Sequence, residues 1–205
     1  RWMFAHNLPR PGGKPLKPHS SLCTGNYYPN LMTVAAQEKA FLQRHIDERI
    51  PFDCWWQDAG WYPCDGVGWP KVGTWEVDPV RFPNGLRELS DLMHAQGKLV
   101  MVWFEPERVH TGTWIADNQP EWVYGGNNGG LLKLGVPECR AWLTDHIDKI
   151  ITEQGIDYYR QDFNIDPLPF WRGNDAEDRQ CITEIRHVEG YFTYWDELRR
   201  RHPNM

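Results

Sequence analysis

The sequence predicts an α/β fold in which parallel strands alternate with helices. Short continuous apolar blocks, typical of buried parallel strands, recur along the chain, and amphipathic helical stretches lie between most of them. The 205 residues are 40% hydrophobic and 24% charged, which is enough to bury one sizeable core. No low-complexity linker divides the chain. We therefore expect an irregular lead-in over residues 1–21 and one domain over residues 22–205.

Five strands are predicted, each as a short apolar block rich in β-branched or aromatic residues. They lie at residues 22–28, 52–56, 98–104, 131–134 and 156–159. This spacing gives one strand–helix unit every few dozen residues, as in a parallel sheet. A full (β/α)8 barrel typically needs about 250 residues. The pattern alone therefore leaves two alternatives, an open sheet or part of a barrel.

Helices are predicted over residues 33–50, 86–96, 137–154 and 182–202. Thr33 is the expected cap of the first helix, and Pro51 closes it. Pro137 occupies the first position of the third helix, where a missing N–H costs nothing. Gly97 and Gly155 end the second and third helices. Strand, helix, strand, helix in this order supports a wall of βα units.

Charge and composition exclude several classes of function. Twenty-two Lys and Arg against 28 Asp and Glu give a formal charge of −6, so we expect no nucleic-acid partner. No run approaches the roughly 18 apolar residues of a membrane span, and the start resembles no signal peptide. The sequence therefore predicts no membrane association and slightly favours a cytoplasmic location.

Metal and cofactor motifs are also missing from the sequence. The five cysteines are odd in number and never form a C-x-x-C pair, which favours reduced thiols. The eight histidines show no zinc-binding spacing, and no glycine-rich phosphate-binding motif occurs. We therefore expect neither a metal nor a cofactor.

Polar and aromatic residues concentrate where four of the predicted strands end, the first, second, third and fifth. In a barrel these carboxyl ends converge on one mouth. Carboxylates, a guanidinium and indole rings in one cleft are suited to a sugar, whose hydroxyls need charged partners and whose C–H face packs on an aromatic plane. The alternative is that these charges are structural ion pairs. The residues are Asn26, Tyr27, Tyr28, Trp56, Gln57, Asp58, Trp61, Trp103, Glu105, Glu107, Arg160, Asp162 and Asn164.

Five ordered blocks carry a family resemblance. They are QDAGWY (57–62), GTWEVDPVRFPNGL (73–86), WFEPERV (103–109), LLKLGVPE (131–138) and YRQDFN (159–164). Their order and spacing resemble the catalytic barrel of glycoside hydrolase family 36, the α-galactosidases, from about residue 22 to the end. The resemblance implies a (β/α)8 TIM barrel of which this chain contains about the first five βα units.

The resemblance also implies roles for the residues after the fifth predicted strand. Asp162 aligns with the nucleophile in the K-W-D-x-N block of the family, which attacks the anomeric carbon in a retaining double displacement. Arg160 replaces a Lys that contacts ring hydroxyls, which exchanges a point donor for a fork. Asn164 is expected to orient the nucleophile by a hydrogen bond.

Further substrate-binding residues follow from the earlier blocks. The D-D-G-W block of the family binds the 4- and 6-hydroxyls of galactose, and here Gln57 and Asp58 stand in its place, with Ala59 inserted before the glycine. Trp56, Trp61 and Trp103 are expected to shape the sugar pocket. Glu105 is expected either at the mouth or just behind it. The list of candidate substrate-binding residues is therefore Gln57, Asp58, Trp56, Trp61, Trp103, Glu105, Arg160 and Asn164.

A second catalytic carboxyl is required for retention, about 5 to 5.5 Å from the nucleophile. In the family it follows a later strand, in a C-x-x-G-G-type block that this chain does not contain. We expect the 205 residues alone to be inactive, and the full-length protein to cleave terminal α-linked galactose from oligosaccharides. A homo-oligomeric full-length protein is left open. Gln57 and Arg160 leave open an α-N-acetylgalactosaminidase or another α-glycosidase of the same clan. A catalytically silent carbohydrate-binding module also stays open.

Overall fold

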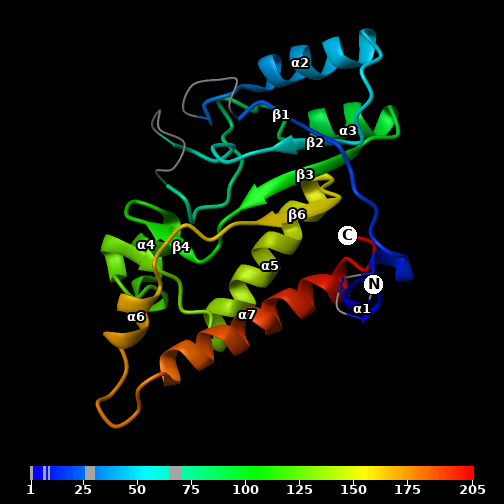
Figure 1. Ribbon diagram of the computed structural model, residues 1–205. Coiled ribbons are helices and arrows are strands. Elements are labelled where there is room, and N and C mark those ends of the chain that lie inside the picture. Colours follow the sequence, from blue (N-terminus) through cyan, green and yellow to red (C-terminus); the bar gives the residue numbers. More distant parts are fainter. Residues whose placement is uncertain (1, 7, 9, 26–30, 65–70) are drawn as a thin grey trace.

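A computed structural model describes residues 2–6, 8, 10–25, 31–64 and 71–205 of the chain. Its centre is a four-stranded parallel sheet in the order β1-β2-β3-β6 (Figure 1). The strands are β1 (Ser21–Cys23), β2 (Cys54–Gln57), β3 (Leu99–Phe104) and β6 (Tyr158–Gln161). The pairs β1–β2, β2–β3 and β3–β6 are all parallel. The prediction of a parallel α/β fold is therefore confirmed. Part of the first predicted strand, 26–28, lies outside the described residues.

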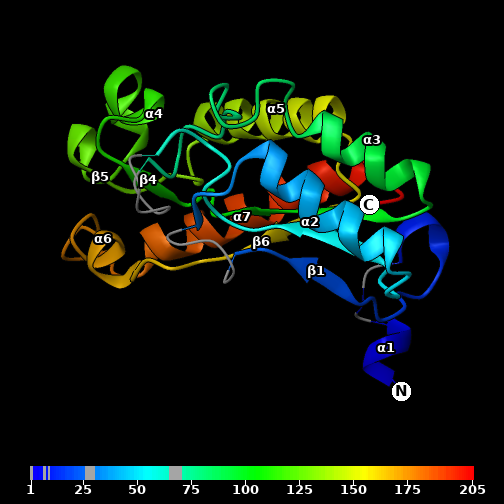
Figure 2. The ribbon, with the colours of Figure 1, turned by 90° about the horizontal axis from the view of Figure 1, so that it is seen from above.

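Four longer helices lie on one side of the curved sheet (Figure 2). They are α2 (Ala35–Asp47), α3 (Arg87–Ala95), α5 (Pro137–Gln154) and α7 (Ile182–Arg201). Right-handed crossovers between adjacent parallel strands place every connecting helix on the same face, which gives a section of barrel wall. The predicted helices are present, but the expected cap of the first one is wrong. Val34 occupies that position, and its N–H donates to the side chain of Gln37.

The shorter elements surround the two ends of the sheet. They are α1 (Trp2–His6), η1 (Pro11–Gly13), β4 (Arg108–His110), α4 (Trp114–Asn118), η3 (Pro120–Trp122), η4 (Gly126–Asn128), β5 (Gly129–Leu131) and α6 (Leu168–Arg172). The lead-in contacts the other end of the chain, because Gly12 N–H donates to the Pro203 carbonyl at 2.8 Å. The division into residues 1–21 and 22–205 stays a prediction.

The strand predicted at 131–134 does not join the parallel sheet. Its first residue ends β5, which pairs antiparallel with β4 in a separate two-stranded sheet. Gly129 and Gly130 both have positive φ, and a Cβ on Gly129 would lie 2.4 Å from the Val109 carbonyl oxygen. Leu131, Leu132 and Leu134 are buried all the same. The prediction failed because an apolar run indicates that a segment is buried, but does not indicate which strand it pairs with.

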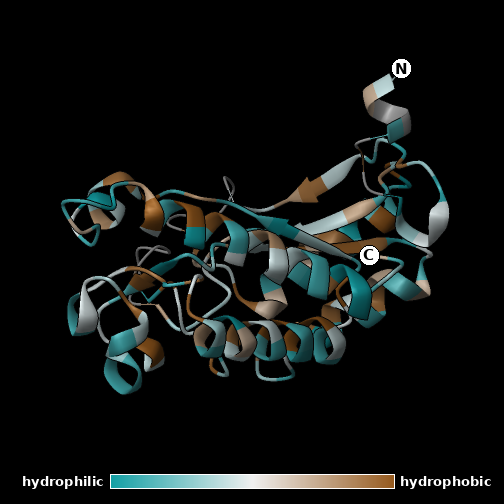
Figure 3. Ribbon diagram, turned by 90° about the horizontal axis from the view of Figure 1, so that it is seen from below, coloured by the Kyte–Doolittle hydropathy of each residue, from teal (hydrophilic) through white to brown (hydrophobic). Residues whose placement is uncertain are grey.

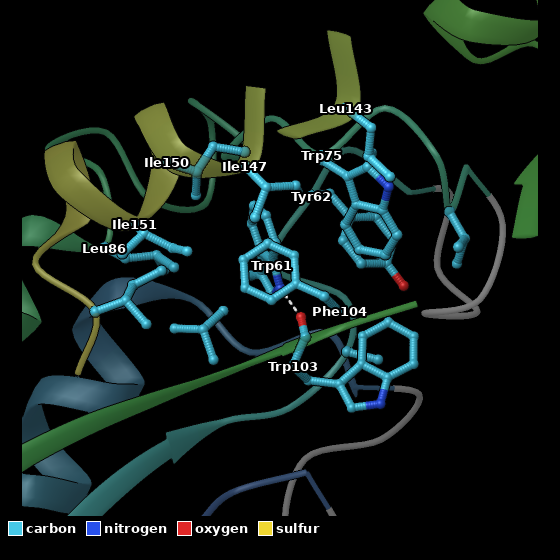
Figure 4. Packing of buried hydrophobic residues seen from close by; sticks show 14 of the residues in the cluster. Trp61, Tyr62, Trp75, Leu86, Trp103, Phe104, Leu143, Ile147, Ile150 and Ile151 are labelled. Carbon is cyan, nitrogen blue, oxygen red and sulfur yellow. Dashed lines mark hydrogen bonds between the residues drawn. The ribbon is translucent and has the colours of Figure 1, made fainter. Parts of the chain in front are cut away.

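The core lies between the sheet and the helices (Figure 4). Trp61, Tyr62, Trp75 and Phe104 form an aromatic group in ring contact with one another. Apolar residues of α5 belong to the same cluster and are labelled in the figure. Hydrophobic residues lie along the strands, and hydrophilic residues cover much of the outer surface of the helices (Figure 3).

The two faces of the sheet differ in burial. In β3, Val100 and Val102 are buried, whereas Leu99 and Met101 are half-buried. Successive strand residues point to opposite faces, so the helices cover one face much more completely than the other. Met101 is in register with Trp56 and Tyr158, and Trp103 with Arg160. These residues therefore belong to the less covered face, which is the inner side of the wall.

All five cysteines are free, as their spacing predicted. Within the described ranges, the helices are too short or too polar for a membrane crossing.

Candidate active site

Asp162 lies immediately after β6, at the edge of the sheet towards which the strands point (Figure 1). Its N–H donates to the Phe104 carbonyl at 2.8 Å, so the pairing of β6 with β3 continues to this residue. The carboxylate accepts hydrogen bonds from the Trp103 indole N–H at 3.1 Å and from the Phe163 N–H at 3.1 Å. With its side chain 33% exposed, Asp162 is held on two sides and remains accessible.

Asp162 is ionised at neutral pH. Partial burial raises the pKa of its carboxyl, but hydrogen bonds from Asn164, Trp103 and the Phe163 N–H, together with the Arg160 charge, outweigh burial and lower the pKa below its usual value. An ionised, partly exposed carboxylate is the form needed for nucleophilic attack on an anomeric carbon.

Arg160 joins Asp162 to Trp56. One guanidinium nitrogen, Nη1, lies 3.5 Å from Asp162 Oδ2, and the guanidinium carbon lies 5.0 Å from the centre of the Trp56 ring. Both residues project from the inner side of the wall, because Trp56 and Arg160 occupy strand positions of the same parity. The sequence prediction that an arginine, an indole and Asp162 meet at one place is therefore met by these contacts.

Two donor atoms of this cluster, Arg160 Nη1 and Trp56 Nε1, are buried and form no hydrogen bond with any described residue. Gln57 Oε1 is a third such atom, at the end of β2 and on the opposite strand parity. Buried polar groups in proteins are nearly always hydrogen-bonded, so such atoms in one place call for an explanation. The first two atoms are donors near an ionised carboxylate.

Gln57, the last residue of β2, and Asp58, which follows it, form a separate pair. Gln57 is buried, and its Nε2 donates to the Asp58 carbonyl at 3.1 Å. The Asp58 carboxylate accepts the Ala59 N–H at 2.8 Å and lies 3.9 Å from the Cys23 thiol. These contacts do not link either side chain directly to Asp162, so the predicted single cluster divides into two groups.

Glu105 does not line the mouth. It is fully buried, and its carboxylate accepts the Asn164 N–H at 2.6 Å and pairs with Arg108 at 2.6 Å. Burial raises the pKa of Glu105, against the lowering effects of Arg108 and Asn164. The prediction that Glu105 binds substrate is corrected, because both of its oxygens are occupied in holding the turn after β6. The position just behind the mouth is where it lies.

The three predicted tryptophans lie in different surroundings. Trp61 is wholly buried in the aromatic group, and its indole N–H donates to the Trp103 carbonyl at 2.9 Å (Figure 4). Its predicted place in the sugar pocket is therefore wrong. Gly60, with φ of +90°, directs the chain inward before it. Trp103 is also buried, and its indole N–H alone reaches the site; Trp56 is half-buried.

A cavity of about 370 Å³ beside Asp162 was not predicted. Its other lining residues are Glu107, Gln161, Phe163, Trp171, His187, Val188 and Tyr191. Burial raises the pKa of Glu107 to about 7 and lowers that of His187 to about 4. Strand alternation would have placed Gln161 opposite Arg160, and helical spacing would have paired His187 with Tyr191. Among the described residues, no group of three His, Cys, Asp or Glu side chains could hold a metal ion.

The carboxyl edge of a curved wall of parallel βα units, where Asp162, Arg160 and Trp56 lie, is the place where (β/α)8 barrel enzymes have their active sites. The Melibiase family model matches residues 40–205, most of the chain. The chain belongs to the Melibiase family, and the resemblance to the α-galactosidases of glycoside hydrolase family 36 is confirmed.

Curated relatives include α-galactosidase Mel36A of Lactobacillus acidophilus, which is 28% identical over 72% of this chain and 21% of its own length. Alpha-galactosidase 2 of Hypocrea jecorina is 30% identical over the same shares. The family 36 α-galactosidase AgaB of Geobacillus stearothermophilus has the same fold, with a TM-score of 0.85, 18% identity, and coverage of 100% of this chain and 29% of its own. The chain thus spans about a fifth of the length of these curated relatives.

Proposed function

We propose that this chain supplies the nucleophile-bearing wall of a retaining α-galactosidase, with Asp162 as nucleophile. The relatives support galactoside hydrolysis at the family level. One observation of the site carries the proposal: an ionised, accessible carboxylate lies beside Arg160, which stacks on Trp56, and both residues have a buried donor atom without a hydrogen-bond partner among the described residues. Sugar hydroxyls would satisfy those atoms, and the carboxylate would face the anomeric carbon.

The proposed reaction has two steps. First, a carboxylate oxygen of Asp162 forms a bond to the anomeric carbon as the glycosidic C–O bond breaks, and the leaving oxygen takes a proton from an acid residue. Next, water attacks the same carbon, gives its proton to that residue, and releases Asp162 as a carboxylate. We assign the acid residue outside these 205 residues, so the activity is proposed for the full-length protein.

The substrate is proposed to be the terminal α-linked galactose of an oligosaccharide. A family 36 α-galactosidase of Geobacillus stearothermophilus has been crystallised with stachyose, and another form with raffinose. Arg160 would donate to ring hydroxyls, and the Trp56 indole N–H would add a further donor. Asp58 and Gln57 would contact hydroxyls from the end of β2.

An acetamido sugar is the second candidate. Gln57 Oε1 is a buried acceptor without a hydrogen bond among the described residues, and the N–H of an acetamido group would donate to it. This atom favours α-N-acetylgalactosaminidase activity as the alternative. Comparing kcat/KM for an aryl α-galactoside and an aryl α-N-acetylgalactosaminide distinguishes the two candidates. A higher kcat/KM for the acetamido substrate would support the α-N-acetylgalactosaminidase and contradict the α-galactosidase.

The test of the nucleophile uses Asp162→Asn in the full-length protein. Loss of a residue that forms the covalent intermediate should lower kcat on an aryl α-galactoside by about 10³-fold or more. Asp166→Asn is the matched control, because Asp166 is exposed on the same loop and its carboxylate accepts only a local hydrogen bond from Leu168 N–H. Asp162→Gly with added azide should yield a β-galactosyl azide, which identifies the attacked face.

Two outcomes would overturn the proposal. If Asp162→Asn keeps a tenth or more of the wild-type kcat, Asp162 is not the nucleophile. If the wild-type full-length protein binds galactose in calorimetry but hydrolyses none of the aryl glycosides, the chain belongs to a silent carbohydrate-binding module. Robust turnover by the 205 residues alone would refute the placement of the acid residue outside them.

A further inference from the structure

We infer that Glu107 is a positioning residue for the nucleophile and acts on Asp162 through Gln161. The inference rests on the proposed function, since it concerns how the attacking carboxylate is placed. Glu107 lies in the loop after β3, and Gln161 is the last residue of β6, directly before Asp162. Neither belongs to the set of residues proposed to contact the sugar.

The Gln161 side chain is fixed by hydrogen bonds to both ends of its amide. Its Nε2 donates to Glu107 Oε2 at 2.8 Å, and its Oε1 accepts from Tyr159 O–H at 2.9 Å and from Trp195 Nε1 at 2.7 Å. Tyr194 O–H donates in turn to the Tyr159 oxygen at 2.9 Å. We call these five residues the Gln161 network.

Glu107 is well suited to anchor this network. Its side chain is buried, with 4% of the residue exposed, and its main-chain carbonyl accepts the Leu132 N–H at 2.7 Å. The carboxyl therefore has little freedom to follow Gln161. Burial also raises its pKa to about 7, but an oxygen is available to accept from Gln161 in either protonation state.

Gln161 and Asp162 share a peptide bond, and successive strand residues point to opposite faces. A fixed Gln161 side chain therefore fixes the backbone from which the Asp162 carboxylate projects towards the inner side. The Asp162 N–H bond to Phe104 and the indole contact from Trp103 hold the same segment from β3. Because a misplacement of 1 Å at a reacting group can cost about 10²-fold in rate, this support matters to the chemical step.

The experiment compares Glu107→Leu with Glu107→Gln in the full-length protein. Leu removes the acceptor, so kcat on an aryl α-galactoside should fall about 10- to 100-fold while KM changes less than about threefold. Gln keeps an acceptor oxygen at the same place and should restore kcat to within about threefold of wild type. Inactivation by a 2-deoxy-2-fluoro α-galactosyl fluoride, which reports the attack step, should slow in parallel with kcat.

Tyr191→Phe is the matched control. Tyr191 lines the same cavity and is outside the Gln161 network, so this variant should keep kcat within about twofold. A folded Glu107→Leu protein with wild-type kcat and inactivation rate would overturn the inference. If Glu107→Leu fails to fold, Gln161→Met tests the same link, and a wild-type kcat there would also overturn it.

The two proposals fail in different ways. Turnover that survives Asp162→Asn refutes the proposed nucleophile and the positioning role with it. Turnover lost in Asp162→Asn but normal in both Glu107→Leu and Gln161→Met refutes the positioning role alone.

Discussion

The two faces of β6 differ in whether their polar side chains are hydrogen-bonded. On the inner face, Arg160 lies over Trp56 and near Asp162, and buried polar atoms of this group lack hydrogen bonds. On the outer face, Tyr159 and Gln161 are joined to α7 and to Glu107 by a continuous set of hydrogen bonds. On this short strand, one face therefore has buried polar atoms without hydrogen bonds to the described residues, and the polar side chains of the other face are joined by hydrogen bonds.

The difference shows how a strand can present reactive groups without losing its position. Unmet hydrogen-bonding capacity is costly in a buried place unless a ligand supplies the partners. Satisfied networks, in contrast, rigidify the backbone that carries them. The hydrogen bonds on the outer face of β6 thus hold the backbone that positions Arg160 and Asp162. The inner face, whose buried donors lack hydrogen-bond partners in the described part of the chain, does not provide this support.

The largest expected effect is on stability, and it concerns Glu107, the buried acid that binds Gln161 on the outer face. The pKa of Glu107 in the folded protein is about 7, above the 4.5 of the free side chain, so the folded state binds the extra proton and loses stability as pH rises through this window. At about 1.4 kcal/mol per unit, the loss approaches about 3 kcal/mol by pH 8. Glu107→Gln should therefore gain about 3 kcal/mol relative to wild type between about pH 4 and pH 8.

Urea unfolding at the two pH values measures this difference. Glu189→Gln, at an exposed position on α7, is the control and should show no such gain. An equal stability difference between Glu107→Gln and wild type at both pH values would contradict the buried, protonated acid.

The next effect tests the inner face. Arg160→Met removes a charged donor and should lower kcat/KM on an aryl α-galactoside about 10- to 100-fold, the range for a charge-assisted hydrogen bond of about 1.5 to 3 kcal/mol. Because the Arg160 charge helps to lower the pKa of Asp162, the acid limb of the pH–rate profile should move to higher pH. Arg160→Lys should recover part of both effects. An unmoved acid limb would show that the ion pair does not act on Asp162.

The smallest expected effect comes from removing one hydrogen bond of the Gln161 network while the others remain. Trp195→Phe removes one donor to Gln161 Oε1, and Tyr159 O–H remains as the other. Thermal and urea unfolding should show a loss of about 1 kcal/mol. We expect kcat to stay within about threefold of wild type. A drop in kcat larger than that of Glu107→Leu would mean that the placement of Asp162 depends on Trp195 more than on Glu107.

The sequence predicted the fold class and the edge of the sheet where the site lies, because both follow from periodic burial and from the topology of parallel strands. The contact of Asp162 with Arg160 also followed, since both lie at the end of one strand. The tertiary partner of an apolar block was not encoded locally: residues 131–134 are buried and yet outside the parallel sheet.

The roles of Trp61 and Glu105 escaped prediction for a related reason. Both residues follow strands, and position in the chain does not say whether a side chain turns inward or towards the mouth. Gly60, in a left-handed conformation before Trp61, is the local feature that turns this residue into the core. Asn164, 59 residues away in sequence, binds Glu105 only in the folded chain, whereas Arg108 is a local partner three residues on.

In the described sheet, β6 is an outermost strand, bonded to β3 alone. The main-chain groups along its other margin are ready to pair with a further strand. A strand that pairs there would lie beside the segment that carries Asp162. Under the proposed function, hydrolysis would require such a completed wall, because the acid residue is assigned outside these 205 residues.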